Sequence, residues 1–280
     1  IALGRSKSKL QKIFGKDILI FDFDDLKNGS LPLGSISICL HAAFARPHCS
    51  YKELAESMAF TNDLFFRLGA HQIPAIINIS SQSVYGQGSP PPWNENTPPG
   101  PNIPYGTAKY STELLLKTIS KQNAQTNTTS IRLAALSGGQ KGLVIQDFMS
   151  KIVNKALKGE RIEIIGGNQQ LEFLDIRDAV SAIITLQKLS PDKWSTTYNI
   201  GAGLFYNIKN IVESIVTQVS EFQNNEPVDI IMIRKNIHQK FGMDNSLFIH
   251  ETNWKPKYGI DAIIKSLIHY LSKNKTFIYK

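Results

Sequence analysis

The chain has 280 residues, 42% hydrophobic and 19% charged, which is an ordinary composition for a globular protein with a large core. Its formal net charge is +8, but the basic residues are scattered instead of forming one basic stripe. This pattern argues against a nucleic-acid partner and favours an anionic small molecule. The uncharged stretch of residues 28–45 contains Gly29, Pro32 and Gly34 and is a poor membrane span.

The sequence contains two cysteines, Cys39 and Cys49, too few for a disulfide framework. Cys39 lies in an apolar run and is expected to be a small buried side chain. The first residues show no apolar core of a signal peptide, so we expect a reducing cytoplasm. His41 and His48 stand near the cysteines, but their spacing fits no zinc ligand pattern, and no metal site is expected.

In the first half of the chain, short apolar runs alternate with segments of helical period. The predicted strands are residues 17–21, 37–40, 75–79 and 129–133. The predicted helices are residues 51–68 and 105–121. Alternation of strand and helix predicts βαβ units with right-handed crossovers, and hence an α/β protein with a parallel sheet.

The second half changes in character after Gly138. Its predicted helices are residues 144–157, 177–189, 208–219 and 261–271, and its predicted strands are residues 162–165, 198–200 and 228–233. The later part is expected to form a small lobe that closes over a ligand. The long loop 87–104, rich in proline and glycine, is expected at the rim of a site, because loops of this length are usually functional or mobile.

One pair of residues is a candidate for a catalytic site. Tyr105 and Lys109 are four residues apart, which places both on one helix face, and Pro104 stands where a helix begins. Upstream, the strand 75–79 runs into the hydroxyl-rich segment 80–83, and ligands of open parallel sheets bind at the carboxyl ends of strands. Alone, the pair is a weak signal: a solvent-facing helix pair and a plain turn are the alternatives.

Together, segments 80–86 and 105–109 resemble the extended short-chain dehydrogenase/reductases, the NAD-dependent epimerase/dehydratase family. Other segments are also similar to the family and occur in the same order as in its members: 40–43, 131–133, 172–179, 198–201 and 253–256. The resemblance implies a Rossmann-type doubly wound parallel sheet with a smaller C-terminal α/β substrate lobe. The NAD(P)-binding domain would take residues 1–138 with part of 174–202, and the substrate lobe mainly residues 139–280.

The resemblance implies a catalytic set of Ser81, Tyr105 and Lys109 beside a nicotinamide. A free tyrosine titrates near pH ~10, so acid–base work near neutrality needs a shift of about three units, roughly 4 kcal/mol. The Lys109 ammonium and the positive nicotinamide would favour the phenolate. Tyr105 would exchange the proton of an alcohol while hydride moves, and Ser81 would hydrogen-bond the reacting oxygen. Lys109 would also hold the nicotinamide ribose.

The implied cofactor site consists of Arg5, Ser6, Asp22, Phe23, Ala42, Ala43, Tyr105 and Lys109. Arg5 follows a strand end and favours NADP slightly over NAD, because arginine accommodates a 2′-phosphate; a plain exposed arginine is the alternative. The pair Asp22-Phe23 resembles the family's adenine-binding pair, and Asp25-Leu26 is a rival register.

The sequence departs from the family at its start. Family members open with a strand and a Gly-x-x-Gly-x-x-Gly turn that binds the pyrophosphate, and no such turn is present here. We expect that one strand–turn–helix unit of roughly 30 residues is absent. Because the missing strand is central in the family's sheet, the strands at 17–21 and 37–40 should not pair directly.

Substrate signals are weaker. Gln82 and Ser83 stand where the family's dehydratases carry Asp-Glu, which disfavours dehydration. Leu171 replaces an arginine that binds a diphosphate in the family, and this replacement weakens the case for a nucleotide sugar. Arg234 could supply that contact or be a surface arginine. The predicted substrate residues are Ser81, Ser83 and Arg234.

The sequence therefore favours an NAD(P)-dependent epimerase or ketoreductase acting on a sugar, expected to be nucleotide-activated. One alternative is a catalytically silent Rossmann protein that binds a nucleotide as a sensor or scaffold. Another is an NADP-dependent reductase of a non-sugar alcohol or ketone. By analogy with the family, the helices at 51–68 and 105–121 would form a homodimer interface. No nucleic acid, membrane or metal partner is expected.

Overall fold

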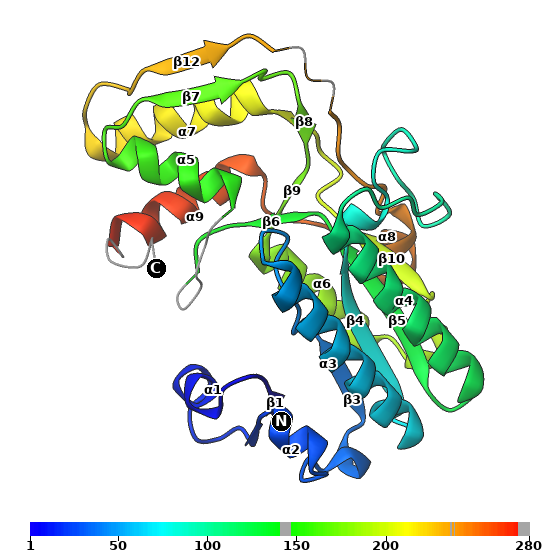
Figure 1. The fold of residues 1–280 in the computed structure, drawn as a ribbon. Helices are drawn as coiled ribbons and strands as arrows, with labels where there is room; N and C mark the ends of the chain where they lie inside the picture. The colour runs from blue at the N-terminus through cyan, green and yellow to red at the C-terminus, as the bar shows by residue number, and fades with distance from the viewer. Residues whose placement is uncertain (141–146, 236, 238, 274–280) are drawn as a thin grey trace. The chain divides into compact units, whose positions relative to one another are not determined.

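The computed structural model describes residues 1–280 except 141–146, 236, 238 and 274–280 (Figure 1). The described residues divide into two compact units. The first unit comprises residues 1–87, 99–132 and 189–198, and the second comprises residues 88–98, 133–188 and 199–280. In this described part, no helix is both long and apolar enough to cross a membrane.

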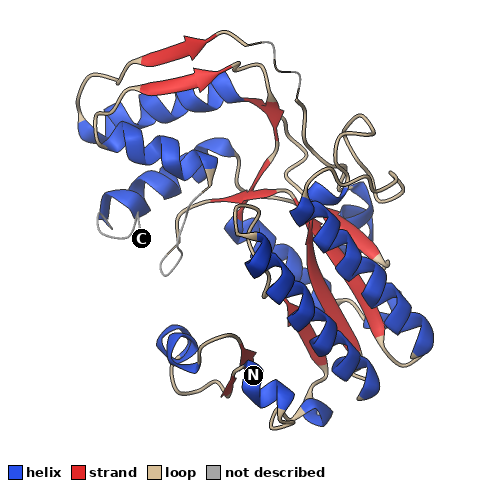
Figure 2. Ribbon diagram, viewed as in Figure 1, coloured by secondary structure: helices blue, strands red, loops and turns tan. Residues whose placement is uncertain are grey.

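A four-stranded sheet with the order β10-β5-β4-β3 lies at the centre of the Rossmann-type part of the chain (Figure 2). Its strands are β3 (Ile38–His41), β4 (Ala75–Ser81), β5 (Asn127–Leu133) and β10 (Thr197–Ile200). Strands β3 and β4 run parallel, with Ile38 opposite Ala75 and His41 opposite Asn78. Ile76 and Ile77 of β4 are fully buried, as a strand covered on both faces requires. The predicted α/β class with a parallel central sheet is confirmed.

Helices α3 (Tyr51–Ala70) and α4 (Pro104–Gln122) pack side by side, and α4 also packs on β4 (Figure 1). A capping box starts α3: the Ser50 hydroxyl accepts the Glu53 N–H, and the Glu53 carboxylate accepts the Ser50 N–H. The helices share an apolar core with Phe65 and Leu116 at its centre. Burying side chains of this size stabilises the unit by about 1.5–3 kcal/mol each, so packing holds α4 firmly against the strand it serves.

The N-terminal segment forms a small sheet of its own. Strand β1 (Ala2–Leu3) pairs in parallel with β2 (Ile20–Phe21), and helices α1 (Lys7–Phe14) and α2 (Phe23–Lys27) follow them. The predicted strand 17–21 is thus confined to its last two residues. Strands β2 and β3 belong to different sheets, as expected from the sequence.

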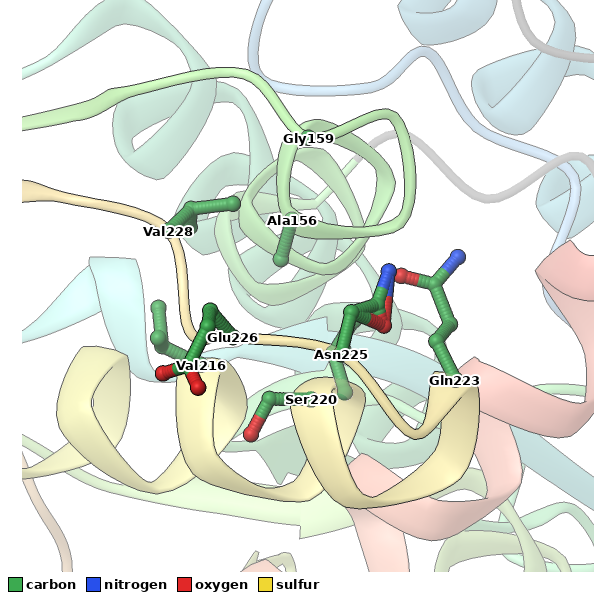
Figure 3. A pocket seen from close by; sticks show the side chains of 9 residues that line it. Ala156, Gly159, Val216, Ser220, Gln223, Asn225, Glu226 and Val228 are labelled. Atoms are coloured by element: carbon green, nitrogen blue, oxygen red, sulfur yellow. The ribbon is translucent and has the colours of Figure 1, made fainter.

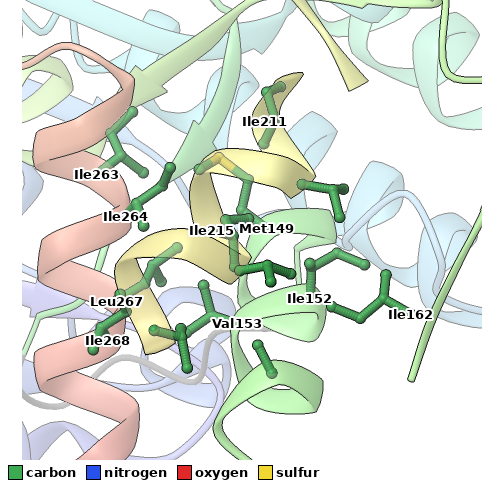
Figure 4. Packing of buried hydrophobic residues seen from close by; sticks show 14 of the residues in the cluster. Met149, Ile152, Val153, Ile162, Ile211, Ile215, Ile263, Ile264, Leu267 and Ile268 are labelled. Atoms are coloured by element: carbon green, nitrogen blue, oxygen red, sulfur yellow. The ribbon is translucent and has the colours of Figure 1, made fainter. Parts of the chain in front are cut away.

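The second unit has a separate core. Three helices pack together around this core: α5 (Phe148–Leu157), α7 (Ile208–Gln223) and α9 (Ile260–Lys273) (Figure 4). Two strands of the same unit pair in parallel, β7 (Ile162–Ile165) and β12 (Ile230–Ile233). Helix α7 buries one stripe of β-branched residues: Ile211, Val212, Ile215, Val216 and Val219. This spacing gives an apolar face at the helical period and explains why the sequence predicted these helices. Residues 144–146 of the predicted helix 144–157 lie outside the described residues.

Several short elements of the second unit have no counterpart among the predicted ones. They are β6 (Ala135–Ser137), β8 (Gln170–Leu171), β9 (Phe173–Asp175), β11 (Tyr206–Asn207) and α8 (Ser246–Thr252). Strand β6 pairs in parallel with β9, and β11 pairs antiparallel with β8. Strands of two or three residues are too short to show periodicity in the sequence. Helix α6 (Ile176–Lys188) was predicted to within one residue at each end.

Candidate active site

The carboxyl end of β4 carries adjacent serines with different partners. The Ser80 hydroxyl is buried and donates to the Glu113 carboxylate of α4. Ser81 lies half-buried and caps the following 3₁₀ turn, Gln82–Val84, where its Oγ accepts the Ser83 N–H at 3.2 Å. The Ser81 hydroxyl also lies 3.2 Å from the Ser83 hydroxyl. Ser81 and Ser83, both predicted substrate residues, are therefore neighbours in space.

Helix α4 brings Tyr105 and Lys109 to the same place. The Ser81 hydroxyl lies close enough to the Tyr105 phenol to lower its pKa. The Lys109 Nζ donates to the Ile79 carbonyl at 2.7 Å and lies 5.9 Å from the centroid of the Tyr105 ring. The three residues predicted as catalytic thus lie together at one end of β4, within one unit. A shared hydroxyl, phenol and ammonium can exchange a proton with an alcohol or a carbonyl oxygen.

A glycine allows this close approach. A Cβ atom placed on Gly106 would lie 2.3 Å from the Ser83 carbonyl oxygen, closer than atoms can come. The first turn of α4 therefore touches the turn that follows Ser81, which brings Tyr105 close to Ser81. The role of Gly106 was not predicted, although a glycine directly after Tyr105 is visible in the sequence.

Burial controls the charge of both ionisable groups. Burial raises the pKa of Tyr105 to about 12, and the hydrogen bond from Ser81 offsets part of this rise. Burial lowers the pKa of Lys109 to about 7, against the attraction of the Glu113 charge. Lys109 was expected to favour the phenolate, but burial is the largest effect on the Tyr105 pKa and favours the neutral phenol. The phenol is therefore protonated near neutral pH, and losing its proton requires a further positive charge nearby.

The chemistry of these donors fits the nicotinamide end of a dinucleotide. An ammonium has three N–H bonds, and for Lys109 the described residues provide one oxygen acceptor, the Ile79 carbonyl. The ring of Phe44 lies beside the ammonium, 4.1 Å from Nζ to the centroid, and meets the Tyr105 ring edge-on. Ala42 and Ala43 link β3 to Phe44 and carry only methyl side chains. Lys109 therefore has donors left for ribose hydroxyls.

The candidate residues for the adenine end lie in the N-terminal segment. Arg5 is exposed, and its charge acts on Glu53 at the start of α3. Ser6 and Asp22 cap helices α1 and α2 through their side chains. The Phe23 ring stacks on Phe60 of α3 with centroids 3.8 Å apart. In the rival register, Leu26 is almost fully buried, and Asp25 forms an ion pair with Lys7.

The second unit holds the other candidate residues. Arg234 is exposed on the segment that follows β12. Leu171 packs against the apolar core of this unit. Next to it, Glu172 is fully buried and accepts the N–H groups of Gly203 and Met243 at 2.7 and 2.8 Å. This carboxylate therefore binds backbone and holds two chain segments together.

The described residues form a small pocket and an open groove. One, in the second unit between the ends of α5 and α7, has a volume of about 40 Å³ and is lined by Gly159, Ser220 and Gln223, among others (Figure 3). It is too small for a sugar ring, since each water already takes about 30 Å³. The other, an open groove of about 520 Å³, runs between Met58 of α3 and Ile103. Among the described residues, no group of three or more His, Cys, Asp or Glu side chains could hold a metal.

Comparison with known proteins identifies the family. Residues 41–201 match the model of the NAD dependent epimerase/dehydratase family, and this range spans more than half of the chain and includes the whole Ser81–Tyr105–Lys109 set. The chain belongs to the NAD dependent epimerase/dehydratase family. The family expected from the sequence is confirmed.

Family members of known activity align along most of their length. The chain is 24% identical to a UDP-glucose 4-epimerase of Erwinia amylovora, over 96% of this chain and 87% of that protein. It is 29% identical to a dTDP-4-dehydro-6-deoxyglucose reductase of Escherichia coli, over 83% of this chain and 75% of the relative.

Solved structures share the fold. The UDP-glucose 4-epimerase of Bifidobacterium longum, in complex with NAD⁺ and UDP, superposes with a TM-score of 0.77 at 19% identity, covering 97% of this chain and 88% of that one. The structure of RMD from Pseudomonas aeruginosa complexed with NADPH gives a TM-score of 0.71 at 18% identity, covering 97% and 99%. Both match nearly the whole described chain, so the second unit also belongs to the common architecture.

Proposed function

We propose that this protein is an NAD(P)-dependent epimerase or ketoreductase acting on a nucleotide-activated sugar, with Tyr105 as its proton donor and acceptor. The observation that carries the proposal is that Ser81, Tyr105 and the buried Lys109 lie together at the end of β4. Relatives whose names specify UDP- and dTDP-linked sugars support the substrate class.

Each residue has a distinct task in this reaction. The phenol of Tyr105 donates its proton to a ketone oxygen during reduction, and its phenolate form takes the proton from the hydroxyl during oxidation. Ser81 hydrogen-bonds the same oxygen and so orients it toward the phenol. Lys109 binds the ribose hydroxyls. When bound, the nicotinamide cofactor accepts or delivers the hydride, and its oxidised ring adds the positive charge that favours the phenolate.

The remaining assignments extend this proposal. Residues 1–138, with part of 174–202, would bind the dinucleotide, and residues 139–280 would mainly bind the sugar nucleotide. Arg5, Ser6, Asp22 and Phe23 would bind the adenosine half, with Arg5 favouring NADP slightly. Ser83 would add a hydrogen bond to the sugar, and the exposed Arg234 would pair with a phosphate. The protein would act in the cytoplasm as a homodimer through α3 and α4.

The decisive experiment uses the purified chain with NAD⁺, NADH or NADPH and a panel of UDP-, dTDP- and GDP-hexoses, with products followed by NMR. Tyr105→Phe should lower turnover by roughly 10²–10⁴-fold, because general acid–base catalysis contributes that much. Tyr110→Phe, on the same helix and half-buried, is the matched control and should keep activity. An active Tyr105→Phe variant would refute the proposed role of the phenol.

The same assays separate the alternatives. A protein that binds cofactor but turns over no sugar would be a silent sensor or scaffold, the reading that the core-packed Leu171 favours. Retention of oxidised cofactor through purification, with no net consumption, would indicate an epimerase. Net NADPH oxidation would indicate a reductase.

A further inference from the structure

A buried ion pair lies directly behind the candidate active site. Glu113 of α4 and Arg132 of β5 are 7% and 4% exposed. Arg132 donates to both carboxylate oxygens, from Nε at 3.0 Å and from Nη2 at 2.6 Å. The other face of the guanidinium lies over the Tyr85 ring, 4.7 Å from its centroid. This is a bidentate pair that is almost fully buried, so losing one partner would leave an uncompensated buried charge.

The pair is connected to the reacting residues by short paths. The Ser80 hydroxyl donates to Glu113, and Ser80 precedes Ser81 in the chain. The carbonyl of Ile79, one residue earlier, accepts a hydrogen bond from the Lys109 ammonium. Glu113 also follows Lys109 by one helical turn on the same buried face of α4. One carboxylate therefore joins the strand end that carries Ser81 to the helix that carries Tyr105 and Lys109.

We propose that Glu113 is a positioning residue: held by Arg132, it fixes the end of β4 against α4, and its negative charge favours the ammonium form of Lys109. The inference deepens the proposed function and rests on it. Because the sugar oxygen must meet Ser81 and Tyr105 together, a shift of the strand end relative to the helix would separate the two donors.

The other groups around Lys109 cannot supply this charge. From α4 itself, Tyr105 is protonated near neutral pH, since burial raises its pKa to about 12. From the end of β3, His41 is neutral, because burial lowers its pKa to about 4. Phe44 offers the face of its ring. From β5, Arg132 is positive and is neutralised by Glu113. Glu113 is the acidic group that opposes the effect of burial on Lys109.

The test titrates Lys109 in the cofactor-free protein. Protein labelled with ¹³C-lysine is followed by NMR from acid to alkaline pH, and the Lys109→Met variant identifies the Lys109 signal. The wild-type midpoint should lie near pH 7. Glu113→Gln should lower it by about one unit or more, since a buried opposite charge shifts a pKa by that amount. Asp63→Asn, which removes a carboxylate from a half-buried pair with Arg67 on α3, should leave the midpoint unchanged.

Position and charge are separated by a second variant. Ser80→Ala removes the hydrogen bond to Glu113 but no charge, so it should leave the Lys109 midpoint unchanged and lower kcat with little change in KM. If Glu113→Gln does not fold, the double variant Glu113→Gln/Arg132→Met, which keeps the net charge of the pair, should lower the midpoint by a smaller amount. The inference is overturned if the Lys109 midpoint is unchanged in Glu113→Gln, or in the double variant where Glu113→Gln does not fold. It is also overturned if Ser80→Ala retains the full kcat.

These outcomes are distinct from failure of the proposed function. The titration needs neither cofactor nor sugar, so it can support the role of Glu113 in a protein that turns over no nucleotide sugar. Conversely, Tyr105→Phe could lose turnover while Glu113→Gln leaves the Lys109 midpoint unchanged. That result would support the proposed function and reject the role of Glu113.

Discussion

The role of His41 is determined by the side chains that surround it. It is 3% exposed; its Nδ1 lies 3.0 Å from the Asn78 side-chain oxygen, and its Nε2 lies 3.2 Å from the Thr61 hydroxyl. Burial lowers its pKa to about 4. A histidine near cysteines could suggest a metal ligand, but here both ring nitrogens have protein partners from β4 and α3. His41 is a hydrogen-bonded core residue.

The buried histidine predicts a loss of stability in acid. The unfolded chain protonates His41 near pH 6.5 and the folded chain only near pH 4, so the unfolded state binds more protons between these values. The free energy of unfolding should therefore fall by about 1.4 kcal/mol per pH unit, about 3 kcal/mol in all, as pH decreases through this window. Urea unfolding at a series of pH values measures the slope. His41→Asn should remove this component; an identical slope in the variant would contradict the assignment.

At the scale of elements, the contact between α4 and the Gln82–Val84 turn determines the geometry of the site. Pro104 starts the helix, Gly106 lets its first turn touch the Ser83 carbonyl, and the buried face that follows includes Lys109 and Glu113. The periodicity of the sequence predicted the helix, and the motif predicted the pairing of Tyr105 with Lys109. The approach of helix to turn depends on an interatomic distance that no periodic pattern contains.

Gly106→Ala tests this contact. The added methyl would lie 2.3 Å from the Ser83 carbonyl oxygen, so the helix and the turn must move apart. We expect a loss of about 1–3 kcal/mol in the free energy of unfolding, as for overpacked sites, and a drop in kcat as Ser81 and Tyr105 separate. Urea denaturation and turnover measure the two effects. Gly34→Ala, where the methyl meets nothing within 4 Å, is the control; equal stability of both variants would contradict the close contact.

At the scale of the whole molecule, each unit has its own apolar core. The first centres on Phe65 and Leu116 between α3 and α4, and the second on residues such as Ile215 and Ile264 from α7 and α9. Long helices with one apolar stripe made both cores predictable in outline. Short strands such as β8 and β9 were not predictable, because their pairing partners lie far away in the sequence.

Core packing in the second unit predicts an asymmetric response to truncation. Ile264 is fully buried among α5, α7 and α9, so Ile264→Ala should reduce the free energy of unfolding by about 2–5 kcal/mol. Ile184 of α6 is 48% exposed, and Ile184→Ala should change it by less than about 0.5 kcal/mol. Chemical denaturation of both variants measures the difference. Similar losses of unfolding free energy in the two variants would contradict the burial of Ile264 in this core.

The amino-acid sequence by itself determined the α/β class and most helices, because these depend on periodicity. The segments that resemble the NAD dependent epimerase/dehydratase family indicated the family, and that resemblance implied the grouping of Ser81, Tyr105 and Lys109. The tertiary structure decided the charge states of Tyr105 and Lys109, the contact made possible by Gly106 and the connection of Glu113 to the site. Charge depends on burial, and burial arises only when segments distant in the chain, such as α4, β4 and β5, close around the same side chains.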